Sequence, residues 1–102
     1  MGIQIIIKDG LRCPVVFCDQ CNQVIENART GNFEWHVDDK WEIDNQGQVY
    51  FTHKQCSYPF EESRGGRHHW HCDELQLFPL FLGHNLKISD RDARRLAQGM
   101  HL

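Results

Sequence analysis

Two pairs of potential metal ligands, far apart in the chain and each with two intervening residues, constrain the fold more than any other feature. The first pair is Cys18-Asp19-Gln20-Cys21 and the second is His53-Lys54-Gln55-Cys56. At this spacing a tight backbone turn aims both side chains at one ion, and three thiolates with one imidazole complete a tetrahedral zinc site with no open position. The sequence therefore predicts one Zn²⁺ per chain, held by Cys18, Cys21, His53 and Cys56, with iron as the alternative occupant.

The size and composition agree with a small metal-stabilised domain. The chain has 102 residues, which suits one domain with a small core, and a metal crosslink adds stability to a domain of this size. Its five cysteines are an odd number, which argues against a complete disulfide framework. No apolar run approaches the roughly 20 residues that span a bilayer, and residues 3–7 are too short for a signal peptide. We therefore expect a cytoplasmic protein without membrane association.

The segments around the ligand pairs favour strands. Residues 1–8 are apolar and β-branched, Asp9-Gly10 is a typical hairpin turn, and Pro14-Val15-Val16-Phe17 leads as a strand into the first ligand pair. Residues 33–37 alternate apolar and polar, as in a half-buried strand. Val49-Tyr50-Phe51-Thr52 is a further strand that ends at the second ligand pair. These patterns predict a zinc-binding β-rich unit with a hairpin between the two pairs.

Residues 63–102 predict a helical C-terminal arm. Apolar residues at helical spacing indicate a helix from Asp73 to Asn85, which Pro79 would kink or divide near its middle. Ser89-Asp90-Arg91-Asp92 resembles a capping box and begins a second short helix that runs through Gln98. The predicted fold class is therefore α+β: a zinc-stapled β-hairpin unit over residues 1–62, followed by a helical pair packed on it in one compact domain.

The ligand spacing resembles that of treble-clef and zinc-ribbon modules. In these modules a CxxC knuckle precedes a β-hairpin, and a second ligand pair lies at a turn or in the first turn of a helix. The resemblance covers residues 14–62, and the HxxC pair is similar to half of a LIM-type site. A LIM module would have a second CxxC directly after Cys56, which this chain lacks. The resemblance is to small bacterial zinc proteins, and it implies a fold rather than an activity.

A second group of potential ligands lies in one short stretch and contains His68, His69, His71 and Cys72. These residues would either bind a second metal or lie near the first one as supporting groups. Ligands that are adjacent in sequence rarely converge on one ion without help from elsewhere in the chain. We therefore favour a third interpretation, in which Cys72 is a small buried apolar residue beside partly exposed histidines.

Charge gives a further indication of function. The net charge is −3, but residues 1–62 carry −5 and residues 63–102 carry +2. A polyanion binder usually has a strong basic excess, so nucleic acid is not the favoured partner. Two successive helices in the arm, the second with Arg91, Arg94 and Arg95, nevertheless leave a DNA-binding regulator as the alternative.

The favoured function is protein–protein interaction or assembly. A closed zinc site holds structure, and residues 75–86 are apolar almost all around the expected helix. Such a helix is either buried on two sides or exposed to a partner. We expect the partner to be another protein or a second copy of the chain, which would make a homodimer through residues 75–86.

No catalytic residues are predicted. The sequence lacks a triad-like pattern and a glycine-rich phosphate loop, and the acidic pairs Asp38-Asp39 and Glu61-Glu62 are interpreted as solvated turns. Two enzymatic alternatives remain open. A zinc hydrolase would have three protein ligands and a water, which requires that His53 is not a ligand. A redox role for Cys18-Asp19-Gln20-Cys21 would place the motif at a helix N-terminus, whereas a strand precedes it here.

Overall fold

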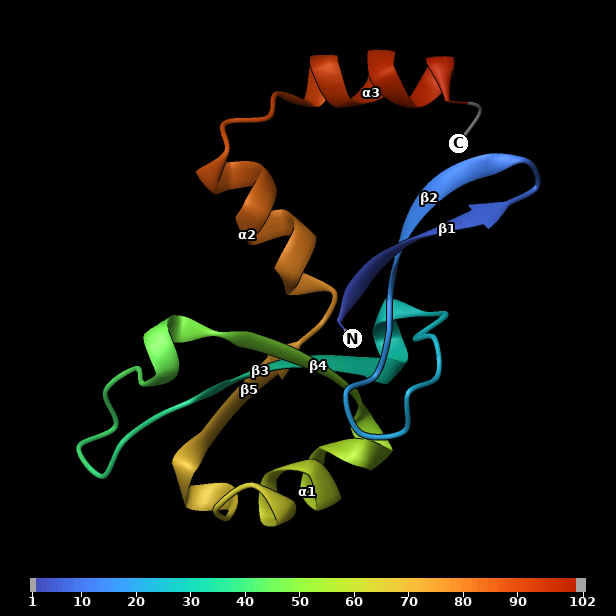
Figure 1. The fold of residues 1–102 in the computed structure, drawn as a ribbon. Helices are drawn as coiled ribbons and strands as arrows, with labels where there is room; N and C mark the ends of the chain where they lie inside the picture. The colour runs from blue at the N-terminus through green and yellow to red at the C-terminus, as the bar shows by residue number, and fades with distance from the viewer. Residues whose placement is uncertain (1, 101–102) are drawn as a thin grey trace.

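The computed structural model describes residues 2–100 and shows an α+β fold with two antiparallel sheets and three α-helices (Figure 1). The strands are β1 (Ile3–Lys8), β2 (Leu11–Val16), β3 (Gly31–His36), β4 (Val49–His53) and β5 (Trp70–Glu74). The helices are α1 (Lys54–Ser63), α2 (Leu77–Asn85) and α3 (Asp90–Gly99). Short 3₁₀ turns are η1 (Ala28–Thr30), η2 (Asn45–Gly47) and η3 (Arg67–His69).

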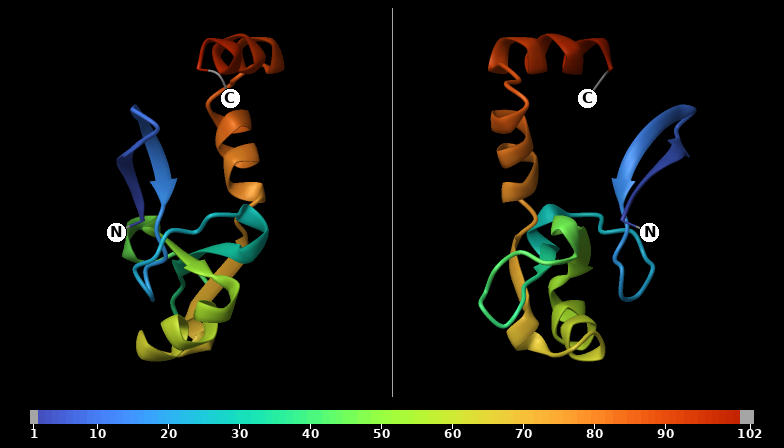
Figure 2. Two further views of the ribbon diagram at one scale, coloured as in Figure 1. Left: turned by 90° about the vertical axis from the view of Figure 1, so that its right-hand side faces the viewer. Right: turned by 60° about the vertical axis from the view of Figure 1, so that its left-hand side comes forward.

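Strands β1 and β2 form a hairpin that stands away from the rest of the molecule (Figure 2). Its turn is the predicted Asp9-Gly10, and both residues have positive φ, 52° and 80°. A two-residue turn of type I′ requires left-handed backbone at both central positions, which glycine and aspartate adopt readily. The predicted hairpin is therefore confirmed, although β2 begins before Pro14.

The second sheet has the strand order β4-β3-β5, with β3 in the centre. The hairpin predicted between the ligand pairs is confirmed, because β3 and β4 pair antiparallel from Gly31 opposite His53 to Trp35 opposite Val49. Side chains alternate between the two faces of a strand. One face of this sheet is covered by α1 and the other by the beginning of α2, as the opposite positions of these helices in Figure 1 show.

The face under α1 is centred on a fully buried phenylalanine, Phe60. Its ring centroid lies 5.6 Å from that of Tyr50 on β4 and 5.0 Å from that of Trp70 on β5. The guanidinium of Arg64 lies 4.0 Å from the Phe60 ring centroid, and the Arg64 carbonyl accepts a 2.9 Å hydrogen bond from the Trp70 indole. These contacts fix α1 to both outer strands of the sheet.

The opposite face is covered where α2 begins. The Phe78 ring lies 5.3 Å from that of Phe33 and 5.1 Å from that of Phe51, measured between centroids. The small core on this side contains Cys18, Ile25, Phe51 and Leu75, with Phe78 packed against it. Beyond this contact α2 leaves the sheet, so only the start of the helix contributes to the core.

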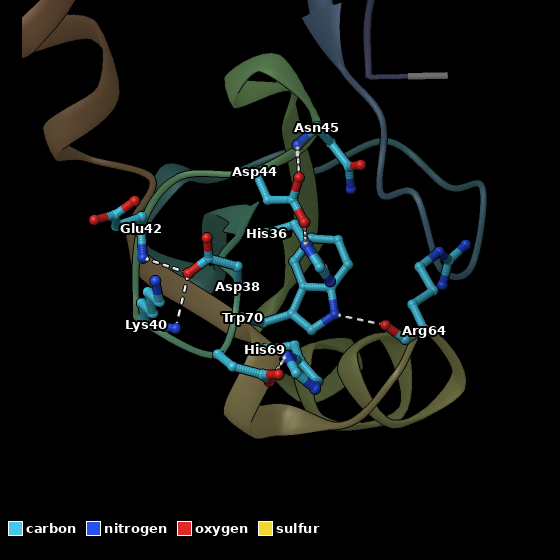
Figure 3. A network of polar contacts seen from close by, with 10 residues as sticks. His36, Asp38, Lys40, Glu42, Asp44, Asn45, Arg64, His69 and Trp70 are labelled. Atoms are coloured by element: carbon cyan, nitrogen blue, oxygen red, sulfur yellow. Dashed lines mark hydrogen bonds and ion pairs between the residues drawn. The ribbon is translucent and has the colours of Figure 1, made fainter.

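The loop between β3 and β4 is held by polar contacts (Figure 3). The Asp38 carboxylate accepts hydrogen bonds from the backbone N–H groups of Lys40 and Glu42, at 2.8 and 3.0 Å. His36 Nδ1 lies 3.2 Å from a carboxylate oxygen of Asp44. These contacts hold the loop between the end of β3 and the start of β4.

The prediction of a helix from Asp73 is wrong in its first turn. Residues Trp70 to Glu74 form β5, which pairs with β3 from His36 opposite Trp70 to Asn32 opposite Glu74, and α2 begins only at Leu77. Hydrogen bonds to β3 make this segment a strand, although its own sequence lacks the regular alternation of apolar and polar residues that would predict one. Pro79 is consequently the third residue of α2, where its missing N–H needs no partner, and the helix runs unbroken.

The final helix agrees with its prediction. Ser89 Oγ accepts a 3.1 Å hydrogen bond from the backbone N–H of Asp92, so the N-cap is confirmed, and the helix extends to Gly99. We call α2 and α3 together (residues 77–99) the arm, and the β4-β3-β5 sheet, α1 and the loop over residues 17–25 the body. Arm and hairpin extend from the body and give dimensions of 46 × 28 × 21 Å (Figure 2). Across residues 2–100, no helix combines the length and apolarity that crossing a membrane requires.

Candidate metal centre

Four side chains predicted as ligands lie together at one edge of the body. The ligand atoms of Cys18, Cys21, His53 and Cys56 are all within 4.8 Å of one another. Cys21 Sγ lies 3.4 Å from His53 Nδ1. Two ligands on one tetrahedral zinc ion, with bond lengths of about 2.3 Å for sulfur and 2.0 Å for nitrogen, are about 3.5 Å apart. The cluster therefore has the donor atoms and the spacing to hold a metal ion.

The first pair lies on a tight turn built around the sulfur of Cys18. Cys18 Sγ accepts hydrogen bonds from the backbone N–H groups of Gln20, Cys21 and His53, at 3.4, 3.5 and 3.4 Å. Asn22 has φ 62°, the left-handed conformation that asparagine tolerates better than most residues. The turn thus presents several N–H groups to a sulfur that can carry negative charge.

These N–H groups change the acidity of the buried thiol. Burial alone raises the pKa of Cys18, but hydrogen bonds from the backbone of Cys21, His53 and Gln20 outweigh it and lower the pKa to about 7. A thiolate is the form that binds metal. The N–H groups of this turn therefore favour the form of Cys18 that binds a metal.

Cys56 responds in the opposite direction. Burial, followed by the neighbouring Cys18 and Cys21 sulfurs, raises the pKa of the Cys56 thiol to about 12. Negative charges this close repel one another, and a bound cation removes that repulsion. A positive ion between the sulfurs would therefore favour the thiolate form of Cys56.

The ring of His53 is oriented by a contact on its far side. Nε2 lies 3.2 Å from the carbonyl oxygen of Val24, which can accept a hydrogen bond only if Nε2 carries the proton. That tautomer leaves Nδ1 with a free lone pair, directed at Cys21 Sγ. Metal-binding histidines are commonly held in this way by a carbonyl or carboxylate on the second ring nitrogen.

Asp19 ties the first turn to the sheet, a role that sequence reasoning missed. Its backbone N–H donates to the Phe51 carbonyl at 2.7 Å, and its carboxylate accepts from the Phe51 N–H at 2.8 Å. The turn thereby continues the hydrogen bonding of β4. Because β4 also leads into His53, this one strand positions both ligand pairs. A turn-favouring aspartate inside the CxxC is the only sequence signal for this contact.

The structure separates the residues of the second predicted group. Successive residues of a strand face opposite sides of the sheet, so His71 stacks on Trp35 and meets Trp41, whereas Cys72 is on the α1 side. Cys72 is nevertheless exposed, so its interpretation as a small buried residue is wrong. The rings of His68 and His69 lie beside each other, with centroids 4.0 Å apart. Within residues 2–100, these three histidines join no group of three or more potential ligands.

Cys72 instead lies with two glutamates, Glu34 and Glu61, whose ligand atoms and the Cys72 sulfur are all within 4.8 Å of one another. Sequence reasoning missed both glutamates. Glu34 is on the polar side of an alternating strand, and Glu61 belongs to an acidic pair interpreted as a solvated turn. That interpretation of Glu61 is wrong, because α1 covers this face and leaves Glu34 and Glu61 buried.

In comparisons with protein-family models, curated proteins and solved structures, nothing matches this chain. Its function is therefore inferred from the chemistry of the two clusters and from the surfaces that remain exposed.

Proposed function

We propose that Cys18, Cys21, His53 and Cys56 hold one structural zinc ion. The convergence of four ligand atoms within 4.8 Å, from two separate backbone segments, carries this proposal. Three sulfurs and one imidazole nitrogen are the donor set of structural zinc sites, and iron is the competing occupant. The set is closed and leaves no position for a reactive water, so the role of the ion is structural. When bound, the ion contributes its binding free energy to folding.

The order of elements supports a treble-clef arrangement over a zinc ribbon. A knuckle over residues 18–21 is followed by the β3–β4 hairpin, and the second ligand pair lies where α1 begins. His53 is the N-cap of α1 and Cys56 is in its first turn. The start of a helix carries a partial positive charge that favours a thiolate, so this placement also suits the chemistry of Cys56.

The zinc-stabilised body serves, in this proposal, as the base of a protein-interaction or assembly module. The arm carries large apolar side chains exposed to solvent: Leu80, Phe81, Leu82, Leu86, Ile88 and Leu96. A concentration of large exposed apolar side chains in one part of a chain is typical of an interaction site. The arm is therefore the element that docks.

A second copy of the chain is the partner that the shape fits best. An apolar groove of about 340 Å³ lies between the β1–β2 hairpin and α2, with Ile3, Val16 and Leu82 in its walls. In a symmetric dimer the same surfaces of both copies meet. The arm of each copy, laid against the groove of the other, would cover both apolar surfaces at once.

Metal content and molar mass in solution test this proposal together. We expect one zinc per chain by elemental analysis and a mass above the 12.0 kDa of one chain by light scattering. Leu80→Glu should reduce the mass to that of the monomer while zinc is retained. Ile43→Glu is the matched control, because Ile43 lies outside the arm and is as exposed as Leu80, 68% in both cases. A chain without metal would overturn the zinc proposal, and a monomeric wild-type protein would overturn the dimer.

The alternative of a DNA-binding regulator rests on the exposed arginines of α3. Arg95 lies 3.7 Å from Asp92, so one of the three positive charges is partly compensated within the helix. Phosphate contacts release counterions, and binding through them weakens steeply with added salt. Binding of duplex DNA that falls steeply with salt and is lost in Arg91→Glu would favour this alternative over the dimer.

A further inference from the structure

Glu34, Glu61 and Cys72 come together through the register of the sheet. Glu34 at the centre of β3 is directly opposite Cys72 on β5, and both side chains point to the face that α1 covers. Glu61 is near the end of α1 and contacts this face from above. The three residues thus approach one point from two strands and a helix, and their ligand atoms lie within 4.8 Å of one another.

Both carboxyl groups are buried, which makes their hydrogen bonding decisive. Glu34 is 0% exposed and Glu61 is 5% exposed. Thr52 Oγ1 donates to Glu34 Oε2 at 2.6 Å, and Ser57 Oγ lies 3.3 Å from Glu61 Oε2. Arg67 Nε lies 3.5 Å from Glu61 Oε1. Three of the four carboxyl oxygens therefore have a partner.

The fourth oxygen, Glu34 Oε1, is buried and has no hydrogen-bond partner among the described residues. A buried carboxylate oxygen without a partner is destabilising, because it has lost its hydrogen bonds to water and gained none in return. Glu34 and Glu61 interact by a hydrogen bond that favours the protonated form of Glu34; once both carboxyl groups ionise, this oxygen lacks a positive partner. A cation between the three side chains would supply it.

We propose that Glu34, Glu61 and Cys72 form a second metal site, which takes a zinc-like divalent cation. The sulfur distinguishes this site from one for magnesium or calcium, which prefer oxygen ligands alone. Three protein ligands leave one coordination position of a tetrahedral ion for water or a small ligand. In this respect the site differs from the closed cysteine–histidine cluster.

Protons compete with the metal at this site. Burial and the neighbouring Glu61 raise the pKa of Glu34 to about 8, despite the opposing hydrogen bond from Thr52. Burial, followed by the charges of Glu34 and Glu61, also raises the pKa of the Cys72 thiol. When the metal binds, it replaces the carboxyl proton of Glu34 and the thiol proton of Cys72. Metal binding therefore strengthens as pH rises. Arg67 now occupies the position next to Glu61 Oε1, and because its side chain is 63% exposed it can move away when a metal binds there.

A cobalt titration of the full chain as purified, with its native metal in place, tests the second site. We expect one further Co²⁺ per chain, with thiolate-to-cobalt absorption, and tighter binding at pH 8.5 than at pH 6.5. Cys72→Ser should abolish the absorption, and Glu34→Gln should weaken binding by about tenfold or more. Cys13→Ser and Glu62→Gln are the matched controls, since neither residue belongs to either cluster.

The outcomes are separable from those that concern the first cluster. Absence of any added cobalt absorption at pH 8.5 overturns the second site, as does an absorption that Cys72→Ser leaves unchanged. Cys72 is exposed, so its substitution by serine should not prevent folding. If Glu34→Gln unfolds the body, Cys72→Ser alone decides. Elemental analysis of the starting protein reports on the first cluster independently.

Discussion

The body and the arm are stabilised in different ways. In the body, buried side chains on both faces of a three-stranded sheet are joined to a cluster of four metal-binding side chains. In the arm, neither α2 nor α3 contains a buried residue. Helices of nine and ten residues are marginal in water without tertiary contacts. The comparison teaches that the body has a buried core and a cluster able to hold a metal, whereas the arm lacks a core of its own, as expected if the proposed partner covers it.

The largest expected effect is loss of the first metal cluster. Cys18→Ser removes a fully buried ligand and leaves an incomplete site, so the body should lose its metal and its cooperative folding. The expected loss is most of the free energy of unfolding, roughly 5–15 kcal/mol for a domain of this kind. Urea unfolding followed by tryptophan fluorescence, with elemental analysis, measures both. Cys13→Ser, on the β1–β2 hairpin, should leave metal content and stability nearly unchanged, and an equal loss there would contradict the assignment of the four ligands.

A pair of phenylalanines compares packing in the two regions. Phe60→Ala should destabilise the body by about 3–5 kcal/mol, because a fully buried ring leaves a cavity between α1 and the sheet. Phe81→Ala in the arm should change the stability of the monomer by less than about 0.5 kcal/mol, since its side chain is 53% exposed. Chemical unfolding at low protein concentration gives both values. Similar losses for the two variants would mean that the arm is packed as tightly as the body.

The pH dependence of stability should carry the signature of Glu34. Its pKa is raised from 4.5 to about 8 in the folded protein, so the folded state binds the extra proton between these values. The free energy of unfolding that this proton contributes is fully present below pH 4.5. It falls by up to about 1.4 kcal/mol per pH unit as pH rises, and it is lost once pH passes 8. Subtracting the profile of Glu34→Gln from that of the wild type isolates it, with both proteins carrying metal in the first cluster and no further metal added. A difference profile that is flat from pH 5 to 8 would show that Glu34 is ionised in the folded protein.

Substituting alanine for one glycine in each region should give the smallest effects on stability, and these effects should have opposite signs. A Cβ at Gly31 would lie 2.8 Å from Leu75 Cδ2 and 2.9 Å from Ile25 Cγ2, both in the buried core. Gly31→Ala should therefore destabilise the body by about 1–3 kcal/mol. A Cβ at Gly83 in α2 meets nothing within 4 Å, so Gly83→Ala should stabilise that helix by about 0.5–1 kcal/mol. Circular dichroism during thermal unfolding measures both, and a destabilising Gly83→Ala would contradict the open surroundings of α2.

The features that the sequence predicted correctly are local ones. The spacing of Cys18, Cys21, His53 and Cys56, the Asp9-Gly10 turn and the Ser89 cap each depend on residues a few positions apart, and the structure contains all of these arrangements. The four ligands required one long-range assumption, that the two pairs converge, and their chemistry made that assumption reasonable.

The features that were missed depend on contacts distant in sequence. β5 becomes a strand because β3 offers it hydrogen bonds, although its own residues alternate poorly. Glu34 and Glu61 are buried because α1 folds over the sheet, which no pattern near either residue indicates. The grouping of Cys72 with these glutamates follows from both contacts, and hence lay beyond single-sequence reasoning.

Helix α1 carries residues of both clusters. It begins beside His53 and Cys56 and carries Glu61 two turns later, within ten residues, a length of about 15 Å. If both proposed ions bind, a cation that orders the start of this helix also helps to fix the position of Glu61, and occupancy of one cluster is then expected to change the affinity of the other. Thermodynamic linkage makes this influence reciprocal and equal in size in both directions. Removing the ion from either cluster with a chelator would then weaken binding at the other cluster by that same factor.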